Sequence, residues 1–197
     1  MLQTSAPDEE RPATRIGGRP LAPVGTMWPS CRTCDGAMQF VAQVRLTDVG
    51  ERGVPPGLLL LFHCRNDPDG CQAWDAEAGG NLALRVVERG AVLLEPLVPS
   101  RKTLLDDMDG VRLVPLDGPY AAQRDRDEQV LGVLGGAPTW VAADATPACG
   151  RCRQPMRFVV QLEARGGGGI DFGAEGSGYG FVCGRCPDEA RFLWQAT

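Results

Sequence analysis

Histidine is almost absent from this sequence, since His63 is the only one among 197 residues. A cysteine nucleophile normally works with a histidine base, and a hydrolytic zinc site normally has histidine or carboxylate ligands beside an open position. The G-x-S-x-G, P-loop and H-E-x-x-H motifs are absent as well. These absences favour a protein that is not an enzyme. An enzyme is expected only if a cleft gathers carboxylates such as Asp171 and Glu175.

Long apolar runs are also absent, and the longest, residues 58–62, is far too short to cross a bilayer. Residues 1–19 contain acids and no apolar stretch, so we expect no signal peptide and a flexible leader over residues 1–14. Without an export signal the expected location is the reducing cytoplasm. Cysteines there serve as metal ligands or catalysts more often than as disulfides.

A basic face of the kind that binds nucleic acid is not visible in the sequence. The net charge is -5, and the acids are spread over both halves of the chain. This balance suits solubility and a basic protein partner. Four arginines, Arg151, Arg153, Arg157 and Arg185, nevertheless surround one group of cysteines and could meet phosphates. Nucleic-acid binding is therefore the alternative to protein binding.

Turn-forming residues are plentiful, with 26 glycines and 16 prolines. This content favours short strands and many turns over long helices. The expected fold class is mainly β, with α+β as the alternative.

The chain also contains an internal repeat. A shift of 118 residues superimposes many identical residues, and a one-residue insertion then brings Phe62 and Cys64 onto Phe181 and Cys183. We therefore predict a tandem duplication of one β-rich module. The residues of the first copy that find an identical partner at this shift are Gly17, Gly18, Pro20, Pro29, Cys31, Cys34, Met38, Phe40, Val41 and Gln43.

Each copy follows the same plan, in which a Gly-Gly-x-Pro turn and a C-x-x-C turn precede two strands. The first strand is expected over residues 38–44 and 156–162, and the second over 57–64 and 178–183. A further hairpin, over residues 81–87 and 91–97, is expected in the first copy alone. The glycine run 166–169 is expected to be a flexible hairpin loop.

The predicted organisation has four parts. A flexible leader (1–14) precedes the first repeat (15–99), a solvated connector (100–130) follows it, and the second repeat (131–197) ends the chain. Short helices are expected at 102–108 and 120–130. The copies are expected to share one pseudo-symmetric core, because each alone has few strands. The core candidates are Phe40, Val41, Leu59, Leu61, Phe158, Val160 and Phe181.

The eight cysteines divide into two sets of four with none left over. The sets are Cys31, Cys34, Cys64 and Cys71, and Cys149, Cys152, Cys183 and Cys186. In each set a C-x-x-C turn is followed, after 29 or 30 residues, by a second pair. Zinc prefers four tetrahedral ligands and binds thiolates well, so the sequence predicts two structural Zn²⁺ ions.

Other uses of these cysteines fit less well. Disulfides need an oxidising compartment, a redox C-x-x-C usually opens a helix, and iron–sulfur ligands usually lie in tighter runs. His63 could replace a ligand, but neighbouring residues of a strand point to opposite faces. If Cys64 faces the metal, His63 is expected to face away.

The quoted residues resemble two known families. The Ile16–Pro20 stretch, Trp28, Pro29 and residues 38–43 are similar to the bacterial YwqG-like family of unknown function. Residues 134–140, the C-x-x-C turn that follows, and the segments 62–64 and 71–74 resemble programmed cell death protein 2 and its relatives. The similarity covers most of both halves but not residues 100–130.

The resemblance implies a non-catalytic role. The eukaryotic relatives look like dedicated chaperones for a basic ribosomal protein, and the YwqG-like proteins often lie in gene neighbourhoods that suggest toxin immunity. YwqG-like members need not have cysteines, so the metal is expected to be a lineage-specific addition. The resulting hypothesis is a zinc-binding protein-interaction module that acts as an adaptor, a chaperone-like protein or an immunity protein.

Overall fold

The computed structural model describes residues 1–51, 53–124, 129–165 and 169–197. The fold is mainly β, as the composition predicts, with one short α-helix, α1 (Tyr120–Arg124), and a 3-10 turn at Leu46–Val49. The strands are β1 (Leu2–Ser5), β2 (Arg15–Ile16), β3 (Leu21–Ala22), β4 (Gln39–Arg45), β5 (Leu58–His63), β6 (Asn81–Val86), β7 (Val92–Leu93), β8 (Asp109–Leu113), β9 (Val130–Leu134), β10 (Arg157–Glu163), β11 (Ser177–Val182) and β12 (Ala190–Gln195).

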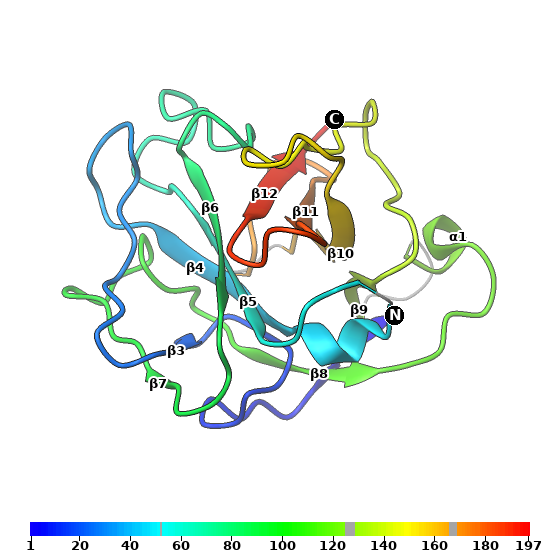
Figure 1. Ribbon diagram of the computed structural model, residues 1–197, viewed down its shortest axis with the longest axis horizontal. Coiled ribbons are helices and arrows are strands. Elements are labelled where there is room, and N and C mark those ends of the chain that lie inside the picture. The colour runs from blue at the N-terminus through cyan, green and yellow to red at the C-terminus, as the bar shows by residue number, and fades with distance from the viewer. Residues whose placement is uncertain (52, 125–128, 166–168) are drawn as a thin grey trace.

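Ten of these strands form one antiparallel sheet that curls into a near-barrel. The order is β12-β11-β10-β9-β1-β8-β2-β4-β5-β6, while β3 and β7 pair separately. The two outer strands, β6 and β12, lie against each other (Figure 1). No ladder joins them among the described residues, but the Trp194 amide of β12 donates a hydrogen bond of 3.2 Å to the carbonyl of Trp74, which lies in the turn before β6. We call this junction the seam.

The two halves of the sheet mirror each other about its centre. From the centre outward, one half runs β2-β4-β5-β6 and the other β9-β10-β11-β12. The ladder β4–β5 shifts register between Phe40 and Ala42, and the ladder β10–β11 shifts between Phe158 and Val160. Each pair of positions is separated by 118 residues. The duplication stays a prediction, and these recurrences support it.

The expected flexible leader is wrong for its first residues. Leu2–Ser5 form β1, which pairs with β8 and β9 in the middle of the sheet, and the Leu2 side chain is fully buried. A strand this short, with a single buried apolar residue, leaves no periodic signal in the sequence. Its partners lie more than 100 residues away along the chain.

The segment 100–130 is also more than a solvated connector. It contains β8, which pairs with β1 and with β2. The strand β1 precedes the first repeat but pairs with β9 of the second, whereas β8 precedes the second repeat and pairs with β2 of the first. The two segments predicted to be repeats therefore exchange their leading strands.

Residues 81–130 differ from the prediction in their local structure as well. β6 pairs with β5, and β7 pairs with β3 instead of with β6, so the expected hairpin is absent. The second repeat has its own counterpart of β6, namely β12, which pairs with β11. Residues 102–108 form turns and bends instead of a helix. Of the predicted helix 120–130, the described residues show α1 at Tyr120–Arg124 and the start of β9 at Val130, and residues 125–128 lie outside the described part.

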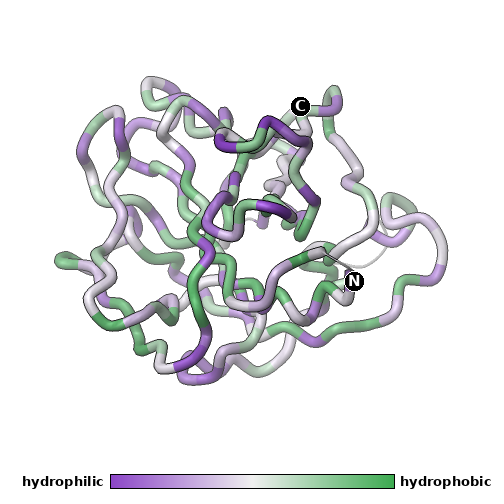
Figure 2. Tube along the Cα trace, viewed as in Figure 1, coloured by the Kyte–Doolittle hydropathy of each residue, from purple (hydrophilic) through white to green (hydrophobic). Residues whose placement is uncertain are grey.

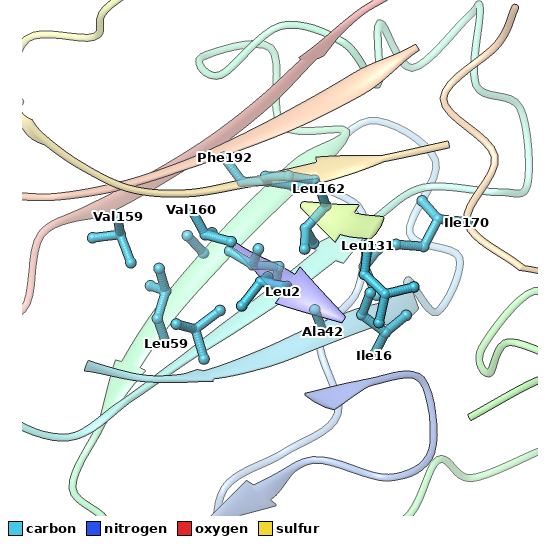
Figure 3. Close-up of a cluster of buried hydrophobic side chains, with 14 of the residues drawn as sticks. Leu2, Ile16, Ala42, Leu59, Leu131, Val159, Val160, Leu162, Ile170 and Phe192 are labelled. Atoms are coloured by element: carbon cyan, nitrogen blue, oxygen red, sulfur yellow. The ribbon is translucent and has the colours of Figure 1, made fainter. Parts of the chain in front are cut away.

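The core has one shared part and two outer parts. The shared part fills the inside of the curled sheet with residues from both repeats, including Leu2, Leu59, Val160 and Phe192 (Figure 3). Strand β5 is hydrophobic over nearly its whole length (Figure 2), and both of its faces are buried. The outer parts pack behind the two groups of cysteines. All seven predicted core residues are buried.

Within the described ranges, no helix has both the length and the apolar character needed to cross a bilayer.

Candidate metal centres

The structure brings the eight cysteines together in the two predicted groups of four. The first group comprises Cys31, Cys34, Cys64 and Cys71, and the second Cys149, Cys152, Cys183 and Cys186. In each group the first pair lies on a turn before a strand, β4 or β10, and the second pair follows the neighbouring strand, β5 or β11. The pairing of those two strands therefore sets the distance between the cysteine pairs.

The turn that carries the first pair is built in the same way in both groups. An isolated antiparallel bridge closes it, between Ser30 and Ala37 in one group and between Ala148 and Pro155 in the other. The residue after the second cysteine, Asp35 or Arg153, adopts a left-handed conformation, with φ of 57° and 60°. This conformation lets the chain reverse within four residues, so both sulfur atoms point to the same side.

The sulfur geometry fits a tetrahedral metal ion. All four sulfur atoms of a group lie within 4.8 Å of one another. Cys34 Sγ and Cys64 Sγ are 3.7 Å apart, and Cys152 Sγ and Cys183 Sγ are 3.5 Å apart. Zinc–sulfur bonds of about 2.3 Å in a tetrahedron place sulfur atoms about 3.8 Å apart, whereas a disulfide needs about 2.05 Å. Each group can therefore hold a metal ion, and all eight cysteines are free thiols.

Backbone amides stabilise negative charge on the inner sulfur atoms. The Thr33 amide donates to Cys31 Sγ at 3.4 Å, and the amides of Arg185 and Cys186 donate to Cys183 Sγ at 3.4 and 3.3 Å. Burial alone would raise the pKa of Cys183, but these two amides lower it to about 7. An amide that donates to sulfur favours the thiolate, which is the form that binds a metal.

Two further thiols, Cys71 and Cys186, need a cation before they can ionise. Burial, together with the neighbouring thiols, raises the pKa of Cys186 to about 12 and raises that of Cys71 as well. Four negative charges within 4.8 Å repel one another strongly unless a metal ion compensates them. This donor set is suited to Zn²⁺, which would be held by all four thiolates and would cross-link the two strands.

Most of the sulfur ligands of both centres are buried. In the first group only Cys34 is exposed, and in the second only Cys152 is partly exposed. The other sulfur atoms pack against apolar residues such as Phe62 and Phe181. An ion bound to four thiolates in such a shell has no free position for water or substrate.

The closing turns of the two centres differ. The C-x-x-C turn of the second group brings the Cys186 amide directly to Cys183 Sγ. The six-residue spacer of the first group is held by Asp67, whose carbonyl accepts from the Cys71 amide at 2.8 Å and whose carboxylate accepts from the Gly70 amide at 3.1 Å. These local turns bring Cys71 to the other three cysteines in spite of the longer spacer.

His63 lies away from the metal centre, as the strand alternation predicts. It is fully buried, and its Nε2 forms a hydrogen bond of 2.9 Å with Gln39 Oε1, while its ring packs edge-on against Phe172. Burial, with Arg65 nearby, lowers its pKa to about 3, so the imidazole is neutral. His63 has no place among the sulfur ligands.

Two buried glutamines anchor the segments that precede the cysteine turns, and no role for them is predicted from the sequence. Gln43 Oε1 accepts a hydrogen bond of 2.9 Å from the Leu21 amide, and Gln161 Oε1 accepts one of 2.8 Å from the Thr139 amide. Both side chains are fully buried in the sheet. Leu21 and Thr139 are separated by 118 residues, as are the glutamines. In the sequence, their equivalence is signalled by the recurrence of glutamine at the shift of 118 residues.

The charged residues around the two centres differ between the repeats. Arg151, Arg153, Arg157 and Arg185 are exposed around the second centre. In the described part of the chain, none of these four arginines forms an ion pair. At the repeat shift, the first three correspond to Thr33, Asp35 and Gln39 of the first centre. The second centre is therefore the more basic of the two.

The two carboxylates named in the enzyme hypothesis line one cavity. Asp171 and Glu175 border a space of about 460 Å³ together with Gln39, Arg65 and Arg101. The Asp171 carboxylate pairs with Arg65 at 2.9 Å and accepts from the Gly173 amide at 3.0 Å. The hydrogen bond from the Gly173 amide and the nearby Arg65 lower the pKa of Asp171, although burial alone would raise it. The carboxylate is therefore kept in its ionised form. Of the glycine run 166–169, only Gly169 lies in the described part, where it borders the same cavity.

Comparison with known proteins gives no family for this chain. No protein-family model and no curated protein sequence matches it.

Proposed function

We propose that this protein is a non-catalytic, zinc-binding protein-interaction module of the cytoplasm. Its two Zn²⁺ ions would be structural and bound by the eight cysteines. The observation that carries the proposal is the pair of four-cysteine groups, each assembled from a turn before one strand and the end of the neighbouring strand. Each centre would fasten two strands of a small sheet and leave the loops around it free to contact a partner.

The charge of the chain supports a basic protein as the partner. The net charge is -5, and the loops of the first centre carry the exposed acids Asp35, Asp67 and Asp69. Opposite charge speeds encounter and excludes wrong partners. An adaptor, a chaperone-like protein and a toxin-immunity protein all act by such binding, and the resemblance to the two families suggests the last two roles.

The absence of a catalytic role is part of the proposal. A general base needs a pKa near the working pH and a path to the substrate. His63 is neutral, fully buried and engaged by Gln39, and Asp171 is held as an anion by Arg65. Neither His63 nor Asp171 is therefore poised to exchange protons with a substrate.

Affinity capture tests this proposal. The tagged protein, loaded with zinc, is used as bait in an extract of its native host, and an unrelated bait with the same tag is the control. We expect one protein to be enriched in near-stoichiometric amount, with the same complex re-formed from the two purified components. Recovery of nothing above the control bait would count decisively against a protein-interaction role.

A second candidate function is nucleic-acid binding at the second centre. Its support is the group of Arg151, Arg153, Arg157 and Arg185, which are exposed and without carboxylate partners in the described ranges. Phosphate contacts give a binding that weakens steeply with salt. Single- and double-stranded oligonucleotides at low salt provide the test, with replacement of all four arginines by glutamine as the control. No binding at low salt ends this candidate.

A further inference from the structure

An apolar groove lies at one end of the seam, where the two repeats meet. It has a volume of about 590 Å³ and is lined by Trp74 and Trp194, with Pro147 and Leu193 continuing the apolar surface. The two indole rings are nearly perpendicular, with centroids 6.2 Å apart. Trp74 is 40% exposed, which is unusual for the largest apolar side chain. The groove therefore offers aromatic faces to solvent at the junction of the repeats.

The rim of the groove carries negative charge from the first repeat. Asp75 and Glu77 both line it and are exposed. Glu77 pairs with Arg191 at 3.0 Å. The Asp75 carboxylate accepts from the amides of Glu77 and Ala78 at 2.6 and 3.3 Å, and no cation of the described part forms an ion pair with it. An uncompensated carboxylate thus stands beside the exposed indole.

One hydrogen-bond donor at the groove has no acceptor. The indole nitrogen of Trp194 is buried and, within the described residues, forms no hydrogen bond. Buried donors of this kind are normally paired. The backbone there is already engaged, since the Trp194 amide bonds to the Trp74 carbonyl. That bond occupies the outward-facing amide of Trp194 at this end of the seam.

We propose that this groove binds a proline-rich segment of a partner protein that carries an arginine or lysine next to its prolines. The inference rests on the proposed protein-interaction function and names the chemistry of the partner. Proline rings pack on aromatic faces, and a polyproline helix loses little entropy on binding because it is already extended. Its carbonyl groups have no internal partners and remain free to accept hydrogen bonds. The basic residue pairs with Asp75 and lies beside the Trp74 ring.

The other occupants fit this groove less well. A phosphate backbone would be repelled by Asp75 and would find a single arginine, Arg153, among the described residues of the lining, since Glu77 is already paired with Arg191. A purely apolar segment would leave the Asp75 charge uncompensated. The combination of two indoles, one of them exposed, with the unpaired Asp75 carboxylate favours an extended, basic and proline-containing segment.

An array of short blocked peptides tests the inference. The array holds P-x-x-P-R and R-x-x-P-x-x-P sequences, with matched analogues in which glycine replaces proline or glutamate replaces arginine. We expect saturable binding of several proline–arginine peptides, about tenfold tighter than their analogues, a difference of about 1.4 kcal/mol. The fluorescence of Trp74 and Trp194 should change on titration with the same peptides.

Variants of the groove supply the control. Trp74→Ala should abolish binding and Trp74→Phe should weaken it less, whereas Leu97→Ala, at a fully exposed apolar site outside the groove lining, should leave it unchanged. Each variant is used only if it retains the metal content and unfolding temperature of the wild type. Peptide binding that ignores proline or arginine, or that survives Trp74→Ala, overturns the inference. So does the absence of any binding peptide.

The outcome is separable from that of the proposed function. If the array fails while a native partner is captured and re-forms a complex, the interaction role stands and the groove assignment falls. A single-stranded oligonucleotide that binds wild type and is lost in Trp74→Ala would overturn the inference in favour of nucleic-acid binding.

Discussion

At each metal centre, individual backbone amides matter as much as the sulfur atoms. The amide bonds to Cys183 favour its thiolate at the buried side of the second centre, while the exposed Cys34 and the half-exposed Cys152 complete each set from the surface. Spacing in the sequence was enough to predict which cysteines meet. The geometry of each centre is local, because a C-x-x-C turn fixes the first pair of cysteines and the hairpin of two adjacent strands brings the second pair to it.

Replacing one ligand should remove one metal ion. In Cys152→Ser the hydroxyl stays protonated at neutral pH and cannot substitute for a thiolate, so we expect the zinc content to fall from two ions to one. Loss of a structural zinc should lower the free energy of unfolding by several kcal/mol, because metal binding is coupled to folding. Elemental analysis and thermal unfolding measure both effects.

The neighbouring exposed residue provides the control for that substitution. Arg151→Ser leaves the four sulfur atoms in place and should retain two zinc ions and the stability of the wild type. A Cys152→Ser protein that keeps both ions would show that Cys152 is not a ligand.

The buried glutamines should contribute to stability at equivalent positions of the two repeats. In Gln161→Ala the Thr139 amide loses its acceptor, and leaving a buried donor unpaired costs about 1–3 kcal/mol. We expect a loss of about 2 kcal/mol in urea unfolding, and a similar loss for Gln43→Ala. The exposed Gln154→Ala should change stability by less than about 0.5 kcal/mol. Equal, negligible effects at all three positions would contradict the role assigned to Gln43 and Gln161.

Among the elements, the strand pairs that are close in sequence were predictable and the distant pairs were not. Strands β4, β5, β10 and β11 carry hydrophobic runs and follow cysteine or glycine turns, so their positions could be inferred. The strands β2, β3 and β7 have two residues each, too few for any alternation. β1 and β8 pair with each other across more than 100 residues, and that pairing depends on the whole fold.

The central position of β1 gives a direct test of its structural role. Leu2 is fully buried in the shared core, so Leu2→Ala should lower the free energy of unfolding by about 2–5 kcal/mol. The same change at Leu97, which is 100% exposed, should cost less than about 0.5 kcal/mol. Denaturant unfolding of both variants decides between a buried strand and the flexible leader that the sequence suggested. Equal stability of the two variants would favour the leader.

For the molecule as a whole, the exchange of β1 and β8 makes the repeats interdependent. The shared core draws Leu59 and Leu61 from the first repeat and Val160 and Phe192 from the second. Each outer core, in contrast, belongs mainly to one repeat and backs one metal centre. The sequence predicted a shared core on the ground of strand number, but the exchanged strands that hold it together were not visible.

Fragments of the chain should therefore fail to fold alone. Residues 1–99 lack β8 and β9, the two partners of β1, and expose half of the shared core. We expect this fragment and residues 100–197 to give spectra of unfolded or aggregated chains when produced singly, and native-like amide spectra when mixed with zinc. A fragment that gives a dispersed spectrum by itself would contradict the proposed dependence of each repeat on the other.

The central claim is that both groups of cysteines bind zinc, and the metal content of the purified protein tests it most directly. Native mass spectrometry of the wild-type chain, purified without added metal, should show two zinc ions per chain and eight cysteines without disulfides. A chain with no metal, with iron, or with disulfide-bonded cysteines would contradict the account and would reopen the redox and secreted alternatives.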